Sequence, residues 1–254
     1  MAYLDCRKYY GRCLLYIQKG IFNCNHVFYS YNHEYLWIYP LVVMNSITAE
    51  KDFPSAKNFV YLNAANVSLM YSGAENGIQG WFDDVSLNGS NNFDDNAEQN
   101  VFKNLHLAAA RLINTSPDNI AAGSSATELL SSLAWAVLPT KDQNVVSTKI
   151  VFPSTVYPWQ RVANSTGCEI RLAKEKNNFV DVDDIIDLID KNTKVVCISH
   201  VEFSNGQTFD LDLLSEAAHE YDALFVVDAT QSAGAIPIDV NKSPIDALVA
   251  GAYK

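Results

Sequence analysis

The chain has 254 residues, of which 48% are hydrophobic and 19% are charged, and its formal net charge is -11. This length and composition predict one large domain with a sizeable core and argue against disorder. The acidic balance argues against a nucleic-acid partner or an anionic-membrane partner, because binding to phosphate groups needs clustered Lys and Arg. A small polar substrate fits the composition better.

The first 43 residues differ in composition from the rest. They contain eight of the thirteen tyrosines and carry a formal charge of +2, which leaves -13 for residues 44–254. Their most apolar run, residues 35–44, is too short to cross a bilayer and contains Pro40, so we expect no membrane insertion. We interpret residues 1–43 as an atypical N-terminal extension, either a docking arm or a stretch foreign to the natural protein. The ordinary start of a folded chain at Met44 favours the second interpretation.

The five cysteines give no sign of a metal site. Cys168 and Cys197 fall inside apolar, strand-like runs, where a thiol is usually an inert core residue, and we expect a reducing, cytoplasmic setting. The first segment holds five potential metal ligands, but it has no C-x-x-C pair and we predict no metal there. These five residues are Cys6, Cys13, Cys24, His26 and His33.

From Met44 onward, apolar runs of strand length alternate with longer helical patterns. This alternation is typical of an α/β protein with a mostly parallel sheet flanked by helices. In chain order, we predict a strand at 58–62, helices at 95–114 and 127–138, strands at 144–147 and 168–172, a helix at 182–189, a strand at 193–199, a helix at 211–221, and strands at 223–227 and 246–250. Several strands are apolar almost throughout, as expected for burial on both faces.

The helix predicted at 95–114 is amphipathic. Asp94 or Asp95 can cap its start, because an Asp side chain accepts hydrogen bonds from free backbone N–H groups. Its expected apolar face consists of Val101, Leu105, Ala108 and Leu112.

A capping box, Ser125-x-x-Glu128, follows the short strand-like run 119–122 and opens the next predicted helix. The box fixes the helix start and leaves backbone N–H groups free, and these attract phosphate together with the helix dipole. The hydroxyl of Thr127 can add another donor. Capping boxes are common, so this signal becomes informative only together with other motifs.

Three chemically useful side chains fall just past the ends of predicted strands: His200, Asp228 and Lys254. Ligands gather at the carboxyl ends of parallel strands, so we predict a site there. A lysine amine can form a Schiff base with an aldehyde cofactor, and a carboxylate can keep a pyridine nitrogen protonated. Taken alone, Asp228 could be a strand cap and Lys254 a solvated lysine.

In company with further motifs, these residues resemble the class V aminotransferase and cysteine desulfurase family over about residues 59–254. Members of this family are fold type I enzymes that use pyridoxal 5'-phosphate. The run Val60–Ala65 is similar to the family's entry strand and the loop near the substrate carboxylate. Ser125, Ala126 and Thr127 are similar to its phosphate-binding helix start.

Three later motifs follow the family's order. Phe152, which opens the run Phe-Pro-Ser-Thr, is similar to the aromatic residue that lies over the cofactor ring. Asp228 and Gln231 are similar to the pair at the pyridine nitrogen and the 3-oxygen. Tyr253 and Lys254 stand in the family's Schiff-base motif. The motifs are specific jointly, and none of them is specific alone.

The resemblance implies a fold type I large domain, pyridoxal 5'-phosphate as the cofactor and Lys254 as the catalytic residue. The implied activity is Schiff-base chemistry on a small amino-acid substrate, by transamination, a lyase reaction or desulfuration, in a homodimer. No metal is predicted. The implied cofactor-binding residues are Ser125, Ala126, Thr127, Phe152, Asp228, Gln231, Tyr253 and Lys254.

Some positions depart from the family's pattern. Glu202 and Phe203 follow His-Val where many relatives carry x-Asn, so the role of Glu202 is open. Gly251 stands where desulfurases often have a phosphate-binding serine, and Tyr253 stands where they have histidine. Both changes weaken a desulfurase assignment.

The family's small domain, its substrate-carboxylate arginine and the desulfurase cysteine would all lie beyond Lys254. We therefore expect residues 44–254 to be an incomplete large domain and this chain to be inactive by itself. The alternative is an inactive fragment or an interaction protein derived from such an enzyme. A nucleotide-binding α/β enzyme is disfavoured, because neither G-x-G-x-x-G nor G-x-x-x-x-G-K-[ST] occurs.

Overall fold

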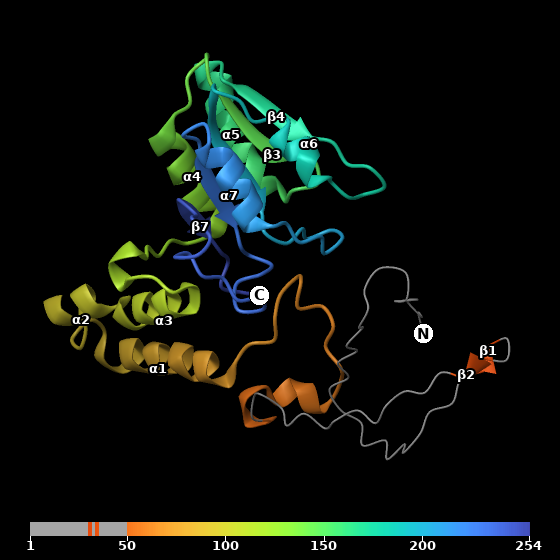
Figure 1. Cartoon of the computed structure of the whole chain (residues 1–254). Helices are drawn as coiled ribbons and strands as arrows, with labels where there is room; N and C mark the ends of the chain where they lie inside the picture. Colours follow the sequence, from red (N-terminus) through yellow and green to blue (C-terminus); the bar gives the residue numbers. More distant parts are fainter. Residues whose placement is uncertain (1–29, 32–33, 36–49) are drawn as a thin grey trace. The chain divides into compact units, whose positions relative to one another are not determined.

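The computed structural model describes residues 30–31, 34–35 and 50–254 (Figure 1). The chain divides into two compact units, residues 1–64 with 68–89 and residues 65–67 with 90–254. The domain boundary predicted at residue 44 stays a prediction. Five residues considered as metal ligands lie outside the described part of the chain: Cys6, Cys13, Cys24, His26 and His33.

The first unit contains short elements and one long helix. Strands β1 (Ser30–Tyr31) and β2 (Glu34–Tyr35) pair antiparallel. Two 3-10 helices, η2 (Glu50–Asp52) and η3 (Pro54–Lys57), precede helix α1 (Ser72–Asn88). The strand predicted at 58–62 is wrong. A strand needs a hydrogen-bonded neighbour, and these residues pair with no other strand among the residues that the structure describes.

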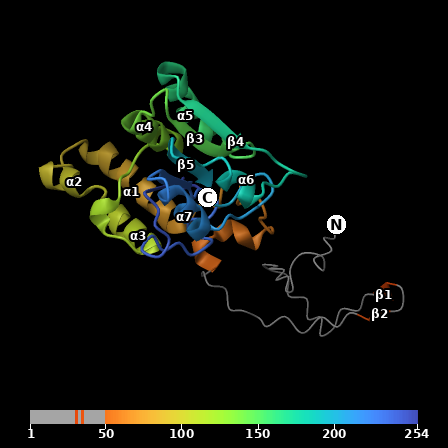
Figure 2. The same cartoon turned by 45° about the horizontal axis from the view of Figure 1, so that its top comes forward.

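The second unit is built on a five-stranded sheet with the order β4-β3-β5-β6-β7, and all its pairings are parallel. Figure 2 shows β4, β3 and β5 next to one another. The parallel sheet and its flanking helices confirm the predicted α/β class. The strands are β3 (Asn144–Thr148), β4 (Glu169–Ala173), β5 (Thr193–Ser199), β6 (Leu224–Asp228) and β7 (Ala247–Val249).

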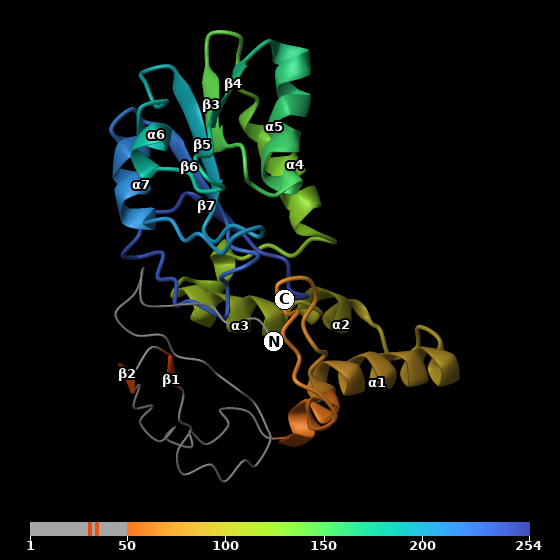
Figure 3. The ribbon, with the colours of Figure 1, turned by 90° about the vertical axis from the view of Figure 1, so that its right-hand side faces the viewer.

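Helices cover both faces of this sheet, with α4 and α5 on one side and α6 and α7 on the other (Figure 3). Side chains on a strand alternate between the faces, so Cys197 of β5 packs with the fully buried Trp159 of α5, while Ile198 packs with Leu214 of α7. Burying an aliphatic or aromatic side chain of this kind stabilises the fold by roughly 1.5–3 kcal/mol. The helices are α4 (Ala126–Val137), α5 (Pro153–Thr166), α6 (Val182–Ile186) and α7 (Leu211–His219).

The helix predicted at 95–114 is two helices, α2 (Asp95–Asn100) and α3 (Lys103–Ile113). Asp94 caps the first, as predicted, by accepting a hydrogen bond from Ala97 N at 2.8 Å. The predicted apolar face is not continuous, because Val101 lies in the break between α2 and α3. Ala110 is the buried residue of α3, while the side chains of Val101, Leu105, Ala108 and Leu112 are exposed.

The strand-like run predicted at 119–122 is also absent. Its first residue closes the 3-10 helix η4 (Pro117–Asn119), whose start is capped by Ser116 Oγ, which accepts a hydrogen bond from Asp118 N. Within the described residues, no helix is both long enough and apolar enough to span a bilayer. The same residues contain no group of His, Cys, Asp and Glu that could hold a metal ion.

Candidate functional site

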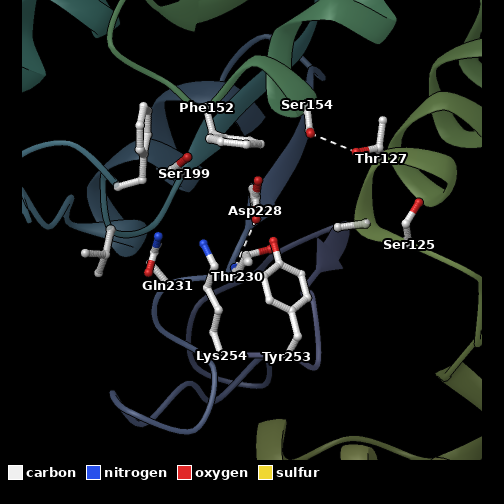
Figure 4. A pocket seen from close by; sticks show the side chains of 13 residues that line it. Ser125, Thr127, Phe152, Ser154, Ser199, Asp228, Thr230, Gln231, Tyr253 and Lys254 are labelled. Carbon is white, nitrogen blue, oxygen red and sulfur yellow. Dashed lines mark hydrogen bonds between the residues drawn. The ribbon is translucent and has the colours of Figure 1, made fainter. Parts of the chain in front are cut away.

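A pocket opens at the carboxyl ends of β5, β6 and β7 in the second unit, beside the starts of α4 and α5 (Figure 4). All eight residues predicted to bind a cofactor line this one pocket. Five further residues complete its lining: Ser154, Ser199, Val201, Phe203 and Thr230. His200, which we had grouped with Asp228 and Lys254, is buried and does not line the pocket, because its side chain alternates to the other face of the strand.

Asp228 is the last residue of β6 and is only 5% exposed. Its Oδ2 accepts a hydrogen bond from Thr155 Oγ1 at 2.8 Å, and its Oδ1 accepts one from Thr230 N at 3.0 Å. Both donors are neutral, and no ion pair of Asp228 with a Lys, Arg or His exists among residues 50–254. The carboxylate is therefore fixed in direction while its charge stays available to a cationic group of a ligand.

Lys254 projects into the same pocket from the segment after β7 (Figure 4). Its Nζ lies 5.9 Å from the ring centroid of Phe152 and 5.4 Å from that of Tyr253. Partial burial lowers the pKa of Lys254, although the charge of Asp228 acts in the opposite direction. A lowered pKa increases the fraction of neutral amine, which is the nucleophilic form of a lysine.

The start of α4 forms another side of the pocket. Ser125 is its N-cap, and Ser125 Oγ accepts a hydrogen bond from Glu128 N at 3.1 Å. The carboxylate of Glu128 reaches past the N-cap to Ser124, whose N and Oγ donate to it at 2.6 and 2.7 Å and hold the pKa of Glu128 below its ordinary value. The predicted capping box is thus present in a form shifted by one residue.

Two hydroxyl groups connect the starts of α4 and α5 at this side. Thr127 Oγ1 and Ser154 Oγ lie 2.8 Å apart, as the dashed line in Figure 4 marks. First-turn N–H groups of a helix have no partner within that helix, and Ser125, Ala126 and Thr127 line the pocket at this position. This side of the pocket has the chemistry of an anion site.

Aromatic and amide groups form the remaining wall. Phe152 and Phe203 meet edge to face, with ring centroids 5.1 Å apart and an interplanar angle of 87°. Phe203 thus presents an apolar ring where the family pattern suggests an amide. Gln231 lines the pocket and donates from Nε2 to the backbone oxygen of Ala65 at 3.0 Å, which joins two of the motifs that the sequence suggested.

The segment that carries Lys254 is tied to the end of β6. Thr230 Oγ1 accepts a hydrogen bond from Gly251 N at 3.0 Å. A Cβ at Gly251 would lie 2.6 Å from Cε1 of Tyr253, which is closer than carbon atoms approach in folded proteins. A side chain at 251 would therefore require the half-exposed ring of Tyr253 to turn aside.

Two buried titratable groups lie outside the pocket at the end of β5. Glu202 accepts a hydrogen bond at Oε1 from Thr148 Oγ1 at 3.1 Å, and burial raises the pKa of Glu202 to about 7, with Asp228 acting in the same direction. Burial lowers the pKa of His200, whose backbone N donates to the backbone oxygen of Asp228. Sequence reasoning missed the burial of Glu202 and the contact of Thr155 with Asp228.

Comparison with known proteins identifies the family. The model of the family described as Aminotransferase class-V matches residues 61–254. The chain belongs to the class-V aminotransferase family. Among curated class-V relatives, the uncharacterized aminotransferase YcbU of Bacillus subtilis is 27% identical over 202 residues, covering 80% of this chain and 53% of that protein. A probable cysteine desulfurase of Ureaplasma parvum is 29% identical over 209 residues, covering 80% of this chain and 52% of that protein.

Solved structures show the same fold. An apo cysteine desulfurase from Thermococcus onnurineus matches with a TM-score of 0.68 and 23% identity, over 81% of this chain and 52% of that one. A C-DES variant with glycine covalently linked to its PLP cofactor matches with a TM-score of 0.71 and 20% identity, over 80% of this chain and 55% of that one. This chain of the class-V aminotransferase family spans about half the length of the curated relatives it matches.

Proposed function

We propose that the pocket binds pyridoxal 5'-phosphate and that the complete protein acts on an amino acid. One observation carries the proposal: a single pocket brings together a buried carboxylate without a cationic partner, Asp228, and a partly buried lysine amine, Lys254. The start of α4 supplies an anion site at the same pocket. An electron-withdrawing, phosphorylated aldehyde requires all three groups.

The residues fit this cofactor one by one. Asp228 would hold the protonated ring nitrogen, because its orientation is fixed by Thr155 and Thr230 while it forms no ion pair among residues 50–254. The start of α4, from Ser125 to Thr127, would bind the phosphate through backbone N–H groups and hydroxyls. The ring of Phe152 offers an apolar surface for stacking.

When bound, pyridoxal 5'-phosphate supplies an aldehyde for covalent attachment and a ring that accepts electrons from the substrate. Lys254 Nζ would be the attachment point and, once released by a substrate amine, would accept or return the proton on the substrate's α-carbon. Its lowered pKa supports both roles. Transamination, a lyase reaction and desulfuration all share these steps, and relatives named aminotransferase and cysteine desulfurase support an amino-acid substrate.

Three finer statements belong to the same proposal. We infer a cytoplasmic setting from the two free, buried cysteines, Cys168 and Cys197, and a homodimer from the family resemblance. We also expect this chain alone to show no turnover. A substrate carboxylate is held best by a free arginine. None of Arg111, Arg161 and Arg171 lines the pocket, and the guanidinium of Arg171 is already bound by Glu169 and Asp190.

The proposal is tested by trapping the cofactor on its lysine. The purified chain is incubated with pyridoxal 5'-phosphate, reduced with borohydride and mapped by peptide mass spectrometry. We expect the reduced adduct on Lys254, and Lys254→Met should lose it. The matched control is Lys174→Met, which changes an exposed lysine after β4 and should leave the adduct unchanged. An adduct on any other lysine would contradict the assignment of Lys254.

A further inference from the structure

Glu202 is a buried carboxyl that none of the roles above uses. It stands between two residues that line the pocket, Val201 and Phe203, and is itself only 1% exposed. Its Oε1 accepts a hydrogen bond from Thr148, whereas its Oε2 is buried and has no hydrogen-bond partner among the residues that the structure describes. An ionised carboxylate needs more than one neutral donor to offset the loss of water, so this environment favours the protonated form.

The charges around Glu202 also favour the protonated form. In the described part of the chain no cation forms an ion pair with it, and Asp228, at the end of the neighbouring strand, opposes its ionisation. From β3 it is faced by the hydroxyl of Thr148. Residues 203–208 that follow it contain no charged side chain, and His200 before it is neutral at pH 7 because burial lowers its pKa.

We propose that Glu202 keeps its proton until the pH approaches neutrality, and that below this pH Asp228 is the single negative charge at the end of these strands. Glu202 is then a positioning residue, whose neutral carboxyl joins the ends of β3 and β5 through Thr148. Its consequence for ligand binding deepens the proposed function and rests on it. Loss of the proton would place a second carboxylate near Asp228 and would strengthen the attraction for a cationic ring nitrogen.

The first test is a titration of Glu202 in the full chain without cofactor. The side-chain carboxyl carbons of glutamate are labelled with 13C, and the Glu202 signal is assigned by NMR comparison with Glu202→Gln or, should that variant not fold, with Glu202→Asp. We expect the signal to titrate near pH 7, because burial raises the pKa of Glu202 to about 7. A midpoint at the ordinary glutamate value of 4.5 would overturn the proposal.

The second test measures the dissociation constant for pyridoxal 5'-phosphate between about pH 6 and about pH 8 in wild type and Glu202→Gln. At each pH, the ratio of the wild-type constant to the variant constant cancels the titration of the cofactor itself. We expect the affinity of wild type relative to the variant to rise by roughly fivefold across this pH range, a factor at the lower end of those typical for coupling between two sites. Only wild type acquires the second charge.

Glu175→Gln is the matched control, because it removes an exposed carboxylate after β4 and should give a ratio independent of pH. A ratio that stays flat for Glu202→Gln as well would overturn the coupling between Glu202 and Asp228. Failure of the proposed function looks different. Neither wild type nor any variant would then bind the cofactor, while the NMR titration would still decide whether Glu202 bears a proton.

Discussion

Replacing Gly251 with alanine tests how tightly the segment that carries Lys254 is packed. The added Cβ would lie 2.6 Å from Cε1 of Tyr253 and 3.3 Å from Cγ2 of Thr230. Carbon atoms in contact prefer about 3.5–4.0 Å, so the tyrosine ring must move by roughly 1 Å. Gly251 is not among the described glycines with positive φ, so the expected penalty is steric and does not come from the backbone.

The expected cost falls on the pocket more than on the fold. Overpacking in a closed core costs about 1–3 kcal/mol, but the side chain of Tyr253 is 51% exposed and its ring can turn outward. We therefore expect a loss of less than about 1 kcal/mol in the free energy of unfolding. The displaced ring leaves its place beside Lys254, and we expect the affinity for pyridoxal 5'-phosphate to fall about tenfold, equal to about 1.4 kcal/mol.

A double-mutant cycle isolates this collision. The dissociation constant for the cofactor is measured by titration for wild type, Gly251→Ala, Tyr253→Ala and the double variant, with thermal unfolding in parallel. The alanine at 251 should weaken binding beside Tyr253 and should be nearly neutral beside Ala, which gives a coupling energy above about 0.5 kcal/mol. Additive effects of the two substitutions would refute the steric argument.

Three further predictions address the buried acids and their partners. Asp228→Asn should keep the cofactor bound through the start of α4 but lose most turnover of the complete protein. The expected rise in the activation free energy is several kcal/mol, by analogy with about 2.7–4 kcal/mol for the loss of one oxyanion donor. Near-normal turnover would make Asp228 only a strand cap. Thr155→Val leaves a buried oxygen of Asp228 without its donor and should lower the free energy of unfolding in urea by about 1.5–3 kcal/mol, which Thr155→Ser should largely restore. Glu202 has a pKa of about 7 when folded against an ordinary 4.5, so its stabilisation is complete below the lower value and is lost as pH rises through the higher one. Glu202→Gln should remove this loss of unfolding free energy, which is at most about 3 kcal/mol. Unfolding measured against pH with the same dependence in wild type and variant would contradict the prediction.

The parallel sheet was predictable because its inner strands, β3, β5 and β6, are buried almost throughout. β5 spans Thr193–Ser199, the range that its apolar run predicts, and the other sheet strands differ from their predictions by one or two residues. Apolar runs do not reveal a helix whose sequence contains helix breakers. α5 begins at Pro153 and contains Pro158, and α1 contains three glycines, so neither was predicted.

The candidate site was predictable in its members but not in its supports. Its members follow strands or open helices, and the topology of a parallel sheet brings such positions together. The supports depend on contacts between distant residues. Thr155 reaches Asp228 across 73 positions of the chain, and no local pattern signals such a pair. The burial of Glu202 likewise depends on Thr148 and on the turn that follows, so the motif alone left its role open.

The sheet has two edges, and their composition affects how the molecule behaves in concentrated solution. β4 is one edge strand and carries Arg171, which binds Glu169 on the same strand and holds the pKa of Asp190 at about 2. Charged side chains on an edge oppose the addition of a strand from another molecule. The opposite edge, β7, is three residues long and offers little backbone to extend. A neutral residue at 171 would leave Glu169 and Asp190 charged without their cationic partner, so this edge should continue to resist strand addition in such a variant.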